Sequence, residues 1–572
     1  MFIIGDNIIS SLGFTTKENY EAVKAGISGL KSYNLWNLPE SFIASLIDRE
    51  CLQDMFASIN PLSNISYTPF EQAMILSVKE ANKCANIDLA SPNVLFVVST
   101  TKGNVHLLDE NKKYFDKKHL YLWYSANLVA QFFDNPNTPI VISNACISGG
   151  CAQITAQRML QSGKYDYAVV VGADLLCRFI VSGFQSFKAL SPIPCKPFDK
   201  ERCGLNLGEA AVTLIMSNEQ LTMNNNIRLV SGAICNDANH ISAPSRTGEG
   251  SFIALKSVLQ NIDIENIAFI NAHGTATPYN DDMETVAIER SGLANIPVNS
   301  LKGCFGHTLG AAGILESIVS MQALREGIVL KSIGFEQNEQ LTIDVCRENR
   351  LTDKNYFIKM MSGFGGTNAV LLFENAANQK NIENYFDKLT LTNTLYIADH
   401  CKITGSLTDL FRSLKINYPK FFKMDNLSKV GFLAAEILLK NNENKSKTAI
   451  ICFTSAASLN TDTAYQKTIQ DKDNFFPSPS LFVYTLPNIV TGEIAIRHNC
   501  KTETTCYVSE KADEKMIFDI VNQTFNNTPN LQQVLVGWID DDQYSEATMM
   551  LVTTKGDKLF TEENIKKSLL SD

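Results

Sequence analysis

The sequence contains no run of eighteen or more apolar residues, so no segment is typical of a membrane span. Its N-terminus, MFIIGDNIIS, has neither a basic lead nor a cleavage-like site, which favours a first strand over a signal peptide. The 14 cysteines follow no disulfide framework spacing, as is typical of a reducing compartment. We therefore expect a cytoplasmic protein.

Basic surface is also scarce. The formal net charge is −10, and no basic stripe interleaves with aromatic residues, so we expect no nucleic-acid partner. Low-complexity tracts are absent as well. What remains is a globular composition, 45% hydrophobic and 19% charged, over 572 residues, which is long enough for two or three domains.

Short β-branched runs alternate with amphipathic helical stretches along the chain. The runs NVLFVVST, YAVVVGAD and IAFINAHG read as buried strands, and FEQAMILSVKEANK and AAGILESIVSMQAL read as helices. Continuous apolar strands separated by helices indicate an α/β fold whose sheet is covered on both faces. The polar segment 375–388 is the predicted domain boundary, and 441–447 is a predicted loop.

Cys146 lies between a predicted strand, TPIVISNA, and a predicted helix, ISGGCAQITAQRMLQSG. A helix N-terminus favours thiolate over thiol, so we expect a lowered pKa and a sulfur that is nucleophilic near neutral pH. The alternative is that Cys146 is one more small buried residue, and this segment alone does not decide between the two.

Two histidines in glycine-rich surroundings favour the first interpretation. His273 follows one strand-like run, His307 follows another, and Lys302 precedes His307 by five residues. A cysteine with two imidazoles suits acyl chemistry, since sulfur holds an acyl group while the imidazoles polarise a second thioester carbonyl. Zinc is the competing account, but paired close ligands of the CxxC or HxxxH kind are lacking, so we expect no metal.

These motifs resemble those of the β-ketoacyl-acyl carrier protein synthases, the elongating condensing enzymes of the thiolase fold. The likeness rests on SNACISGG, NAHGTATPYND, LKGCFGHTLGAAG and SGFGGTNAVLLF, in that order over residues 1–375. The resemblance implies a thiolase-like α/β fold with two pseudo-symmetric halves, 1–225 and 226–375. It also implies that acyl- and malonyl-loaded carrier protein is the partner and that no organic cofactor is required.

The resemblance further implies roles for individual residues. Cys146 would hold the acyl chain, His273 and His307 would drive decarboxylation of the malonyl extender, and Lys302 would organise the site with Glu316 as its charge partner.

An oxyanion hole would be formed by the backbone N–H groups of Cys146 and Phe364. Phe184 and Phe364 resemble the gate between the acyl pocket and the malonyl side, although both could be ordinary core aromatics.

The tail, residues 376–572, is unexpected for such an enzyme. Its segments SKVGFLAAEILLKNN, KTAIICFTSAASLNTDTAYQ and NLQQVLVGWIDD repeat those of the N-terminal half at a spacing near 360 residues. The tail therefore reads as a second, degenerate N-terminal half, 390–560, without the histidine motifs. A loose alignment places Glu510 opposite Cys146, and we interpret Cys506 as a structural thiol.

The tail resembles truncated chain-length-factor-like subunits of polyene pigment pathways, such as aryl polyene and flexirubin synthesis. Phe482 and Tyr484 would cap the acyl pocket, and the pairing would be an intramolecular pseudo-heterodimer or a homodimer. The alternative is a vestigial duplicate that only stabilises the fold.

The predicted reaction is decarboxylative condensation of malonyl-carrier protein with a Cys-bound acyl chain, giving a 3-oxoacyl-carrier protein in polyene or polyketide synthesis. A housekeeping fatty-acid elongation synthase and a non-catalytic scaffold are the alternatives.

Overall fold

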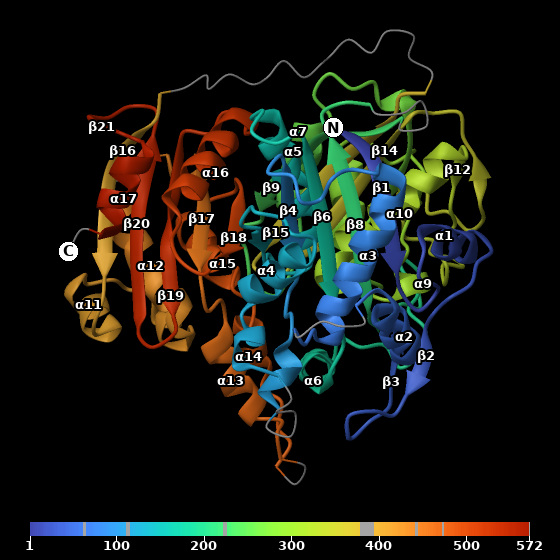
Figure 1. Cartoon of the computed structure of the whole chain (residues 1–572), viewed down its shortest axis with the longest axis horizontal. Helices are drawn as coiled ribbons and strands as arrows, with labels where there is room; N and C mark the ends of the chain where they lie inside the picture. Colours follow the sequence, from blue (N-terminus) through green and yellow to red (C-terminus); the bar gives the residue numbers. More distant parts are fainter. Residues whose placement is uncertain are drawn as a thin grey trace.

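The computed structural model describes residues 1–60, 65–109, 115–220, 226–377, 394–440, 444–471 and 474–570. Most of the predicted boundary at 375–388 and the start of the predicted loop at 441–447 lie outside these residues. Figure 1 shows the main part, residues 1–375, on one side and the tail on the other, joined through neighbouring strands. Among the described residues, no helix is long and apolar enough to cross a membrane.

The strands of the main part and tail form one large mixed sheet, in which the described residues contribute sixteen strands. From one edge to the other, the order is β11 (Val298–Asn299), β10 (Ile267–Asn271), β14 (Tyr356–Gly363), β15 (Thr367–Asn375), β9 (Ile227–Asn236), β1 (Phe2–Ile9), β8 (Ala210–Ser217), β6 (Tyr167–Asp174), β4 (Val94–Ser99), β5 (Ile140–Ile142), β18 (Thr504–Val508), β17 (Thr448–Thr454), β19 (Gln533–Asp541), β20 (Ser545–Thr553), β16 (Tyr396–Ile403) and β21 (Lys558–Leu559). Two small sheets pair β2 (Lys31–Tyr33), β3 (Phe42–Ser45) and β7 (Leu207–Gly208), and β12 (Ile328–Val329) with β13 (Arg350–Leu351).

One five-strand arrangement occurs three times. In the orders β1-β8-β6-β4-β5, β9-β15-β14-β10-β11 and β16-β20-β19-β17-β18, the first three strands are antiparallel neighbours and the last three are parallel neighbours. The first two copies are the pseudo-symmetric halves of the main part, and the third is the tail. The predicted α/β fold with an extra N-terminal-type half is therefore confirmed.

The helices cover this sheet. The first half contains α1 (Thr16–Lys24), α2 (Arg49–Ile59), α3 (Pro69–Ala85), α4 (Leu122–Phe132), α5 (Ser148–Gln161) and α6 (Arg178–Ser186). The second half contains α7 (Glu249–Val258), α8 (Pro278–Arg290), α9 (Lys302–Phe305) and α10 (Ala312–Arg325). The tail contains α11 (Leu407–Ser413), α12 (Asn426–Leu438), α13 (Leu459–Lys467), α14 (Pro479–Tyr484), α15 (Ile489–His498), α16 (Glu514–Asn527) and α17 (Glu562–Leu570).

Local sequence explains where several of these elements begin. Helix α3 starts at Pro69 behind Thr68, whose side chain forms a capping box with Glu71. Strand β6 coincides with the predicted run YAVVVGAD, and all but its first residue are buried. A strand buried on both faces needs apolar residues throughout and not in alternation, as this run has.

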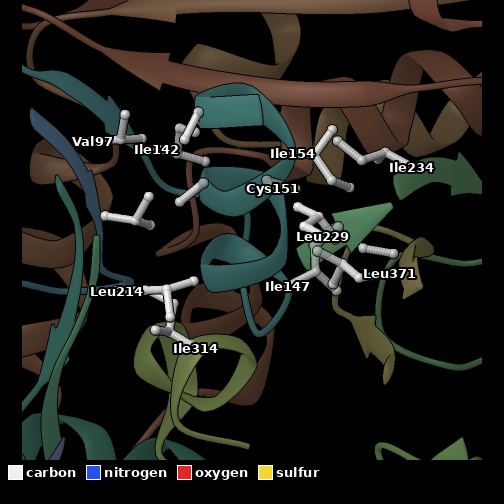
Figure 2. Packing of buried hydrophobic residues seen from close by; sticks show 14 of the residues in the cluster. Val97, Ile142, Ile147, Cys151, Ile154, Leu214, Leu229, Ile234, Ile314 and Leu371 are labelled. Carbon is white, nitrogen blue, oxygen red and sulfur yellow. The ribbon is translucent and has the colours of Figure 1, made fainter. Parts of the chain in front are cut away.

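Helix α5 lies at the centre of the core. Figure 2 shows Ile147, just before α5, and Cys151 and Ile154 of α5 packed among buried residues of both halves, which include Leu214, Leu229 and Ile314. Every residue of α5 from Ser148 to Leu160 is buried. A helix surrounded on all sides cannot be amphipathic, so small residues such as Gly149 and Gly150 are needed where α10 and β14 approach it.

The tail joins the main part through an antiparallel pair of strands. Tyr507 of β18 lies opposite Ile142 of β5, and the Ser143 N–H donates to the Cys506 carbonyl at 3.1 Å. Beside this seam, Arg158 of α5 donates to both carboxylate oxygens of Glu503, at 3.0 and 2.8 Å, and both side chains are buried. The edge strand β5 of the main part is thus covered by the same chain.

Candidate active site

Cys146 sits in a tight turn between β5 and α5. Ala145 has a φ of 50°, in the left-handed region that a residue with a Cβ rarely adopts. Ser148 braces the turn, since its Oγ donates to the Ala145 carbonyl at 2.6 Å and accepts from the Asn144 N–H at 2.8 Å. Helix α5 begins at Ser148, two residues after the thiol, so Cys146 precedes the helix and is held by the turn.

The protonation state of this thiol differs from the prediction. Burial raises the pKa of Cys146 to about 12, while the nearby Lys302 ammonium acts in the opposite direction. The sequence pointed to a lowered pKa because it showed the helix start and not the desolvation that accompanies it. We therefore expect Cys146 to rest as a thiol at neutral pH.

Two histidines reach the same place from the second half. Cys146 Sγ and one ring nitrogen each of His273 and His307 all lie within 4.8 Å of one another. The two rings meet edge to face, with their centroids 5.0 Å apart. The predicted cluster of one cysteine and two histidines is thus brought together, although more than 120 residues separate Cys146 from either histidine.

Backbone hydrogen bonds fix both histidines. The carboxylate of Glu284 accepts from the N–H groups of His273 and Gly274, at 2.6 and 2.7 Å. The Nδ1 atom of His307 accepts from the Leu309 N–H at 3.3 Å, which leaves the proton on Nε2. Burial, and then the charge of Lys302, holds the pKa of each histidine well below its ordinary value. Both imidazoles are therefore neutral, and His307 presents an Nε2–H donor.

A buried charge network lies behind the histidines. Lys302 forms an ion pair with Glu316, as predicted, and Lys359 Nζ lies 2.5 Å from the other Glu316 oxygen. Although burial alone would raise it, the two ammonium groups hold the pKa of Glu316 below its ordinary value. Burial in turn lowers the pKa of Lys359 to about 8.

Lys359 was missed by the sequence analysis. Its Nζ also donates to the Ala272 carbonyl at 3.2 Å, immediately before His273. The available signal was a lysine within the otherwise apolar run of β14, YFIKMM, since a buried cation needs a buried partner.

Two cavities meet at Cys146. The larger, about 330 Å³, is lined by Cys146, His273 and His307 and also by the exposed Tyr279. The smaller, about 20 Å³, is also lined by Cys146, together with Ile180 and Leu309. Phe184 and Phe364 line both cavities, which is where a gate between an acyl side and a malonyl side would lie.

The tail contributes to the smaller cavity through Phe482 and Leu486. Phe482 packs edge to face on Phe184, with ring centroids 5.6 Å apart. Tyr484 lines neither cavity, which contradicts its predicted place in the acyl pocket. It packs in the core of the tail, and its hydroxyl donates to Glu493 at 2.8 Å, because successive residues of the short helix α14 point to different sides.

The predicted oxyanion hole has compatible geometry. Gly363, the residue before Phe364, approaches the Cys146 backbone so closely that a Cβ on Gly363 would lie 3.2 Å from the Cys146 nitrogen. The backbone segments that carry the two expected donors are therefore adjacent.

The ligand atoms of Cys146, His273 and His307 are also spaced as in a metal site. The positive charges near these residues argue against a bound metal ion. Lys302 and Lys359 are close enough to depress the pKa of His307, and the same positive potential opposes a divalent cation. The arrangement suits a site where negative charge develops on a substrate oxygen.

Comparisons with known proteins agree with this geometry. The 3-oxoacyl-[acyl-carrier-protein] synthase 2 of Vibrio harveyi is 26% identical over 413 residues, covering 66% of this chain and 98% of the relative. The ketosynthase ApeO in complex with its chain length factor ApeC, from Xenorhabdus doucetiae, superimposes with a TM-score of 0.58 at 24% identity, covering 66% of this chain and 98% of that chain. The PfaC keto synthase-chain length factor superimposes with a TM-score of 0.77 at 14% identity, covering 97% of this chain and 78% of that chain.

The family matches cover more than half of the chain. Residues 2–221 match the beta-ketoacyl synthase N-terminal domain, and residues 228–336 match the beta-ketoacyl synthase C-terminal domain. Cys146 falls in the first matched region, and both histidines fall in the second. The chain therefore belongs to the beta-ketoacyl synthase family and is an enzyme of the acyltransferase class.

Proposed function

We propose that the protein condenses an acyl chain held on Cys146 with a malonyl group delivered by acyl carrier protein, releasing carbon dioxide. The observation that supports this most is the meeting of Cys146, His273 and His307 at one cavity wall. The curated relative from Vibrio harveyi is named a 3-oxoacyl-[acyl-carrier-protein] synthase, which supports the same reaction.

The first half-reaction loads Cys146. Its sulfur attacks the acyl-carrier thioester, and the backbone N–H groups of Cys146 and Phe364 stabilise the oxyanion. The carrier leaves as a thiol and takes up the proton that Cys146 loses, so no net charge enters the site. A neutral neighbouring imidazole relays that proton, which a thiol with a raised pKa requires.

The second half-reaction uses the histidines. The Nε2–H of His307, together with His273, polarises the malonyl thioester carbonyl, and loss of carbon dioxide leaves an enolate there. The enolate carbon attacks the acyl-Cys146 carbonyl, forming the new carbon–carbon bond and expelling the Cys146 thiolate, which takes a proton from water. Lys302 and Lys359 stabilise the anionic stages electrostatically.

We further propose that the tail acts as a chain-length-factor-like partner, with Phe482 and Leu486 at the floor of the acyl cavity. The chain resembles a keto synthase-chain length factor structure over nearly its whole length, and this supports the arrangement at the level of fold. A cavity closed by the partner half favours synthesis of chains of defined length, of the polyene or polyketide kind, over housekeeping elongation.

Reconstitution tests the reaction. The purified full chain, malonyl-carrier protein and an acyl-carrier protein primer should give 3-oxoacyl-carrier protein and carbon dioxide in equal amounts, followed by intact-protein mass spectrometry. Absence of acyl-Cys146 in a preparation shown to be folded would refute the assignment. Comparing saturated with unsaturated primers then separates polyene synthesis from housekeeping elongation.

A further inference from the structure

Phe364 is placed in the catalytic centre by a peptide unit that both parts of the chain hold. The unit contains the Phe364 carbonyl and the Gly365 N–H. The carbonyl accepts from Asn488 Nδ2 of the tail at 2.8 Å, and the N–H donates to the Ile241 carbonyl of the main part at 2.6 Å. A peptide unit is planar, so fixing both of its polar groups fixes its orientation.

The two glycines after Phe364 leave this segment free to change conformation unless other groups bind it. Gly365 has a φ of 92° and Gly366 a φ of 70°, and glycines in this region have many accessible backbone conformations. Without external partners, rotation of the segment that carries the Phe364 ring and N–H would cost little free energy.

The contact with the tail is close and buried. Asn488 is fully buried, and a Cβ on Gly365 would lie 2.7 Å from its Nδ2 atom. In the other direction, a Cβ on Gly492 of α15 would lie 2.7 Å from the Gly365 carbonyl. Only glycine at both positions allows the start of α15 to approach the Phe364 segment.

We infer that Asn488 is a positioning residue for condensation: from the tail, it holds the Phe364 carbonyl and thereby aims the Phe364 N–H and ring at the acyl group on Cys146. The tail then completes the catalytic geometry of the main part as well as closing its acyl cavity. This inference rests on the proposed function.

The position of Asn488 distinguishes this role from general stabilisation. Its side chain reaches the backbone of Phe364 and lines neither cavity, so it does not contact the substrate. A loosened Phe364 segment would weaken the oxyanion hole and would also let water reach the thioester on Cys146. Two measurable quantities should therefore change together, the condensation rate and the fraction of acyl-Cys146 lost to hydrolysis.

The test uses the full chain with Asn488→Asp and Asn488→Ala. Asp has the same shape but presents oxygen where Nδ2 donated, so it removes the bond without opening a cavity. Both variants should lose about tenfold to a hundredfold in condensation rate per folded molecule, as expected for misplaced catalytic groups, and should release more free acid from acyl-Cys146. The matched control is Ile489→Val, which trims the neighbouring buried residue and should change neither quantity.

The outcomes separate two kinds of failure. If the wild type does not condense, the proposed function fails. If the wild type condenses and both Asn488 variants keep its rate and its ratio of hydrolysis to condensation, the positioning role is overturned. A lowered melting temperature with unchanged turnover and unchanged ratio would also overturn it, because that is the signature of a purely structural residue.

Discussion

The N-terminal half and the tail form the same five-strand unit, yet only the N-terminal half carries the proposed nucleophile, Cys146. Their agreement extends to a turn that follows the corresponding strands β4 and β17. Thr100 Oγ1 donates to Asp174 at 2.9 Å, and Thr454 Oγ1 donates to Asp540 at the same distance. The N–H groups of the following residues also donate to each aspartate. The turn is kept in both copies because each needs it to connect its strands.

The turn that carries Cys146, in contrast, differs between the two copies. Matching Thr100 with Thr454 aligns the two ladders, so that Ile142 corresponds to Tyr507. Four residues further on, Cys146 corresponds to Lys511, which is exposed. The predicted counterpart, Glu510, lies one residue before Lys511 and is also exposed. Cys506, interpreted as a structural thiol, is buried within β18 beside Cys452. The two copies thus share a scaffold, whereas the position that corresponds to Cys146 holds no cysteine in the tail.

The largest expected effect separates the two copies directly. Cys146→Ala should reduce condensation below detection, because no other group can hold the acyl chain. Cys506→Ala, the matched change in the tail, should leave turnover per folded molecule unchanged. Mass spectrometry of the enzyme after exposure to acyl-carrier protein gives the acylation state of each. Condensation that survives in Cys146→Ala would refute the assigned nucleophile.

The histidines come next. His273→Ala and His307→Ala should each still acylate Cys146 but lose on the order of a hundredfold or more in malonyl decarboxylation, since the carbonyl is no longer polarised. Release of labelled carbon dioxide measures this. His400→Ala, in the exposed part of β16, is the control and should behave as wild type. If all three variants lost decarboxylation equally, the loss would come from a less stable protein and not from the chemistry of His273 and His307.

The seam between the copies should be sensitive to one ion pair. Glu503→Ala leaves Arg158 buried without its carboxylate, which should cost about 3 to 5 kcal/mol in the free energy of unfolding. Replacing both residues, with Arg158→Met and Glu503→Leu, should recover most of this loss. Urea unfolding measures both. An unchanged midpoint for Glu503→Ala would show that the pair adds nothing to the seam.

Within the tail, two neighbouring aromatics should respond differently. Phe482→Ala opens space beside Phe184 and should lengthen the carrier-bound products. Tyr484→Ala should cost about 3 to 5 kcal/mol of stability and leave product length unchanged, since that ring lines neither cavity and belongs to a cluster made mostly of tail residues. Mass spectrometry of products at equal folded-enzyme concentration compares them. Identical product profiles in both variants would favour the vestigial interpretation of the tail.

The last prediction compares two thiols of the same protein as the pH changes. Because burial raises the pKa of Cys146 to about 12, its thiolate fraction and its alkylation rate should keep rising, roughly tenfold per pH unit, from pH 7 to pH 10. The exposed thiol of Cys203 provides a reference within the same protein. Peptide mapping after brief iodoacetamide treatment follows both. A Cys146 rate that levels off below pH 8 would restore the lowered pKa that the sequence predicted.

The sequence predicted the fold and the central residues through short-range patterns. Apolar runs such as YAVVVGAD fixed strands, and Cys146, His273 and His307 stood in motifs whose glycines and neighbours identify them without coordinates. Lys359 escaped because its role depends on Glu316, which is distant in sequence and becomes its partner only when β14 packs beside α10. Tyr484 was misplaced for the same reason, since a short helix gave no sign of which side faces the cavity.

By itself the sequence determined that the chain is an α/β protein with a cysteine, two histidines and a duplicated half, because strand runs, motif spacing and repeats are encoded locally. Only the tertiary structure decided the quantities that depend on groups brought together from afar. Desolvation by groups from several parts of the chain raises the pKa of Cys146 against the effect expected from a helix start. The joined sheet brings Phe482 and Asn488 of the tail to a catalytic centre in another part of the chain, because pairing across β5 and β18 places their helices there.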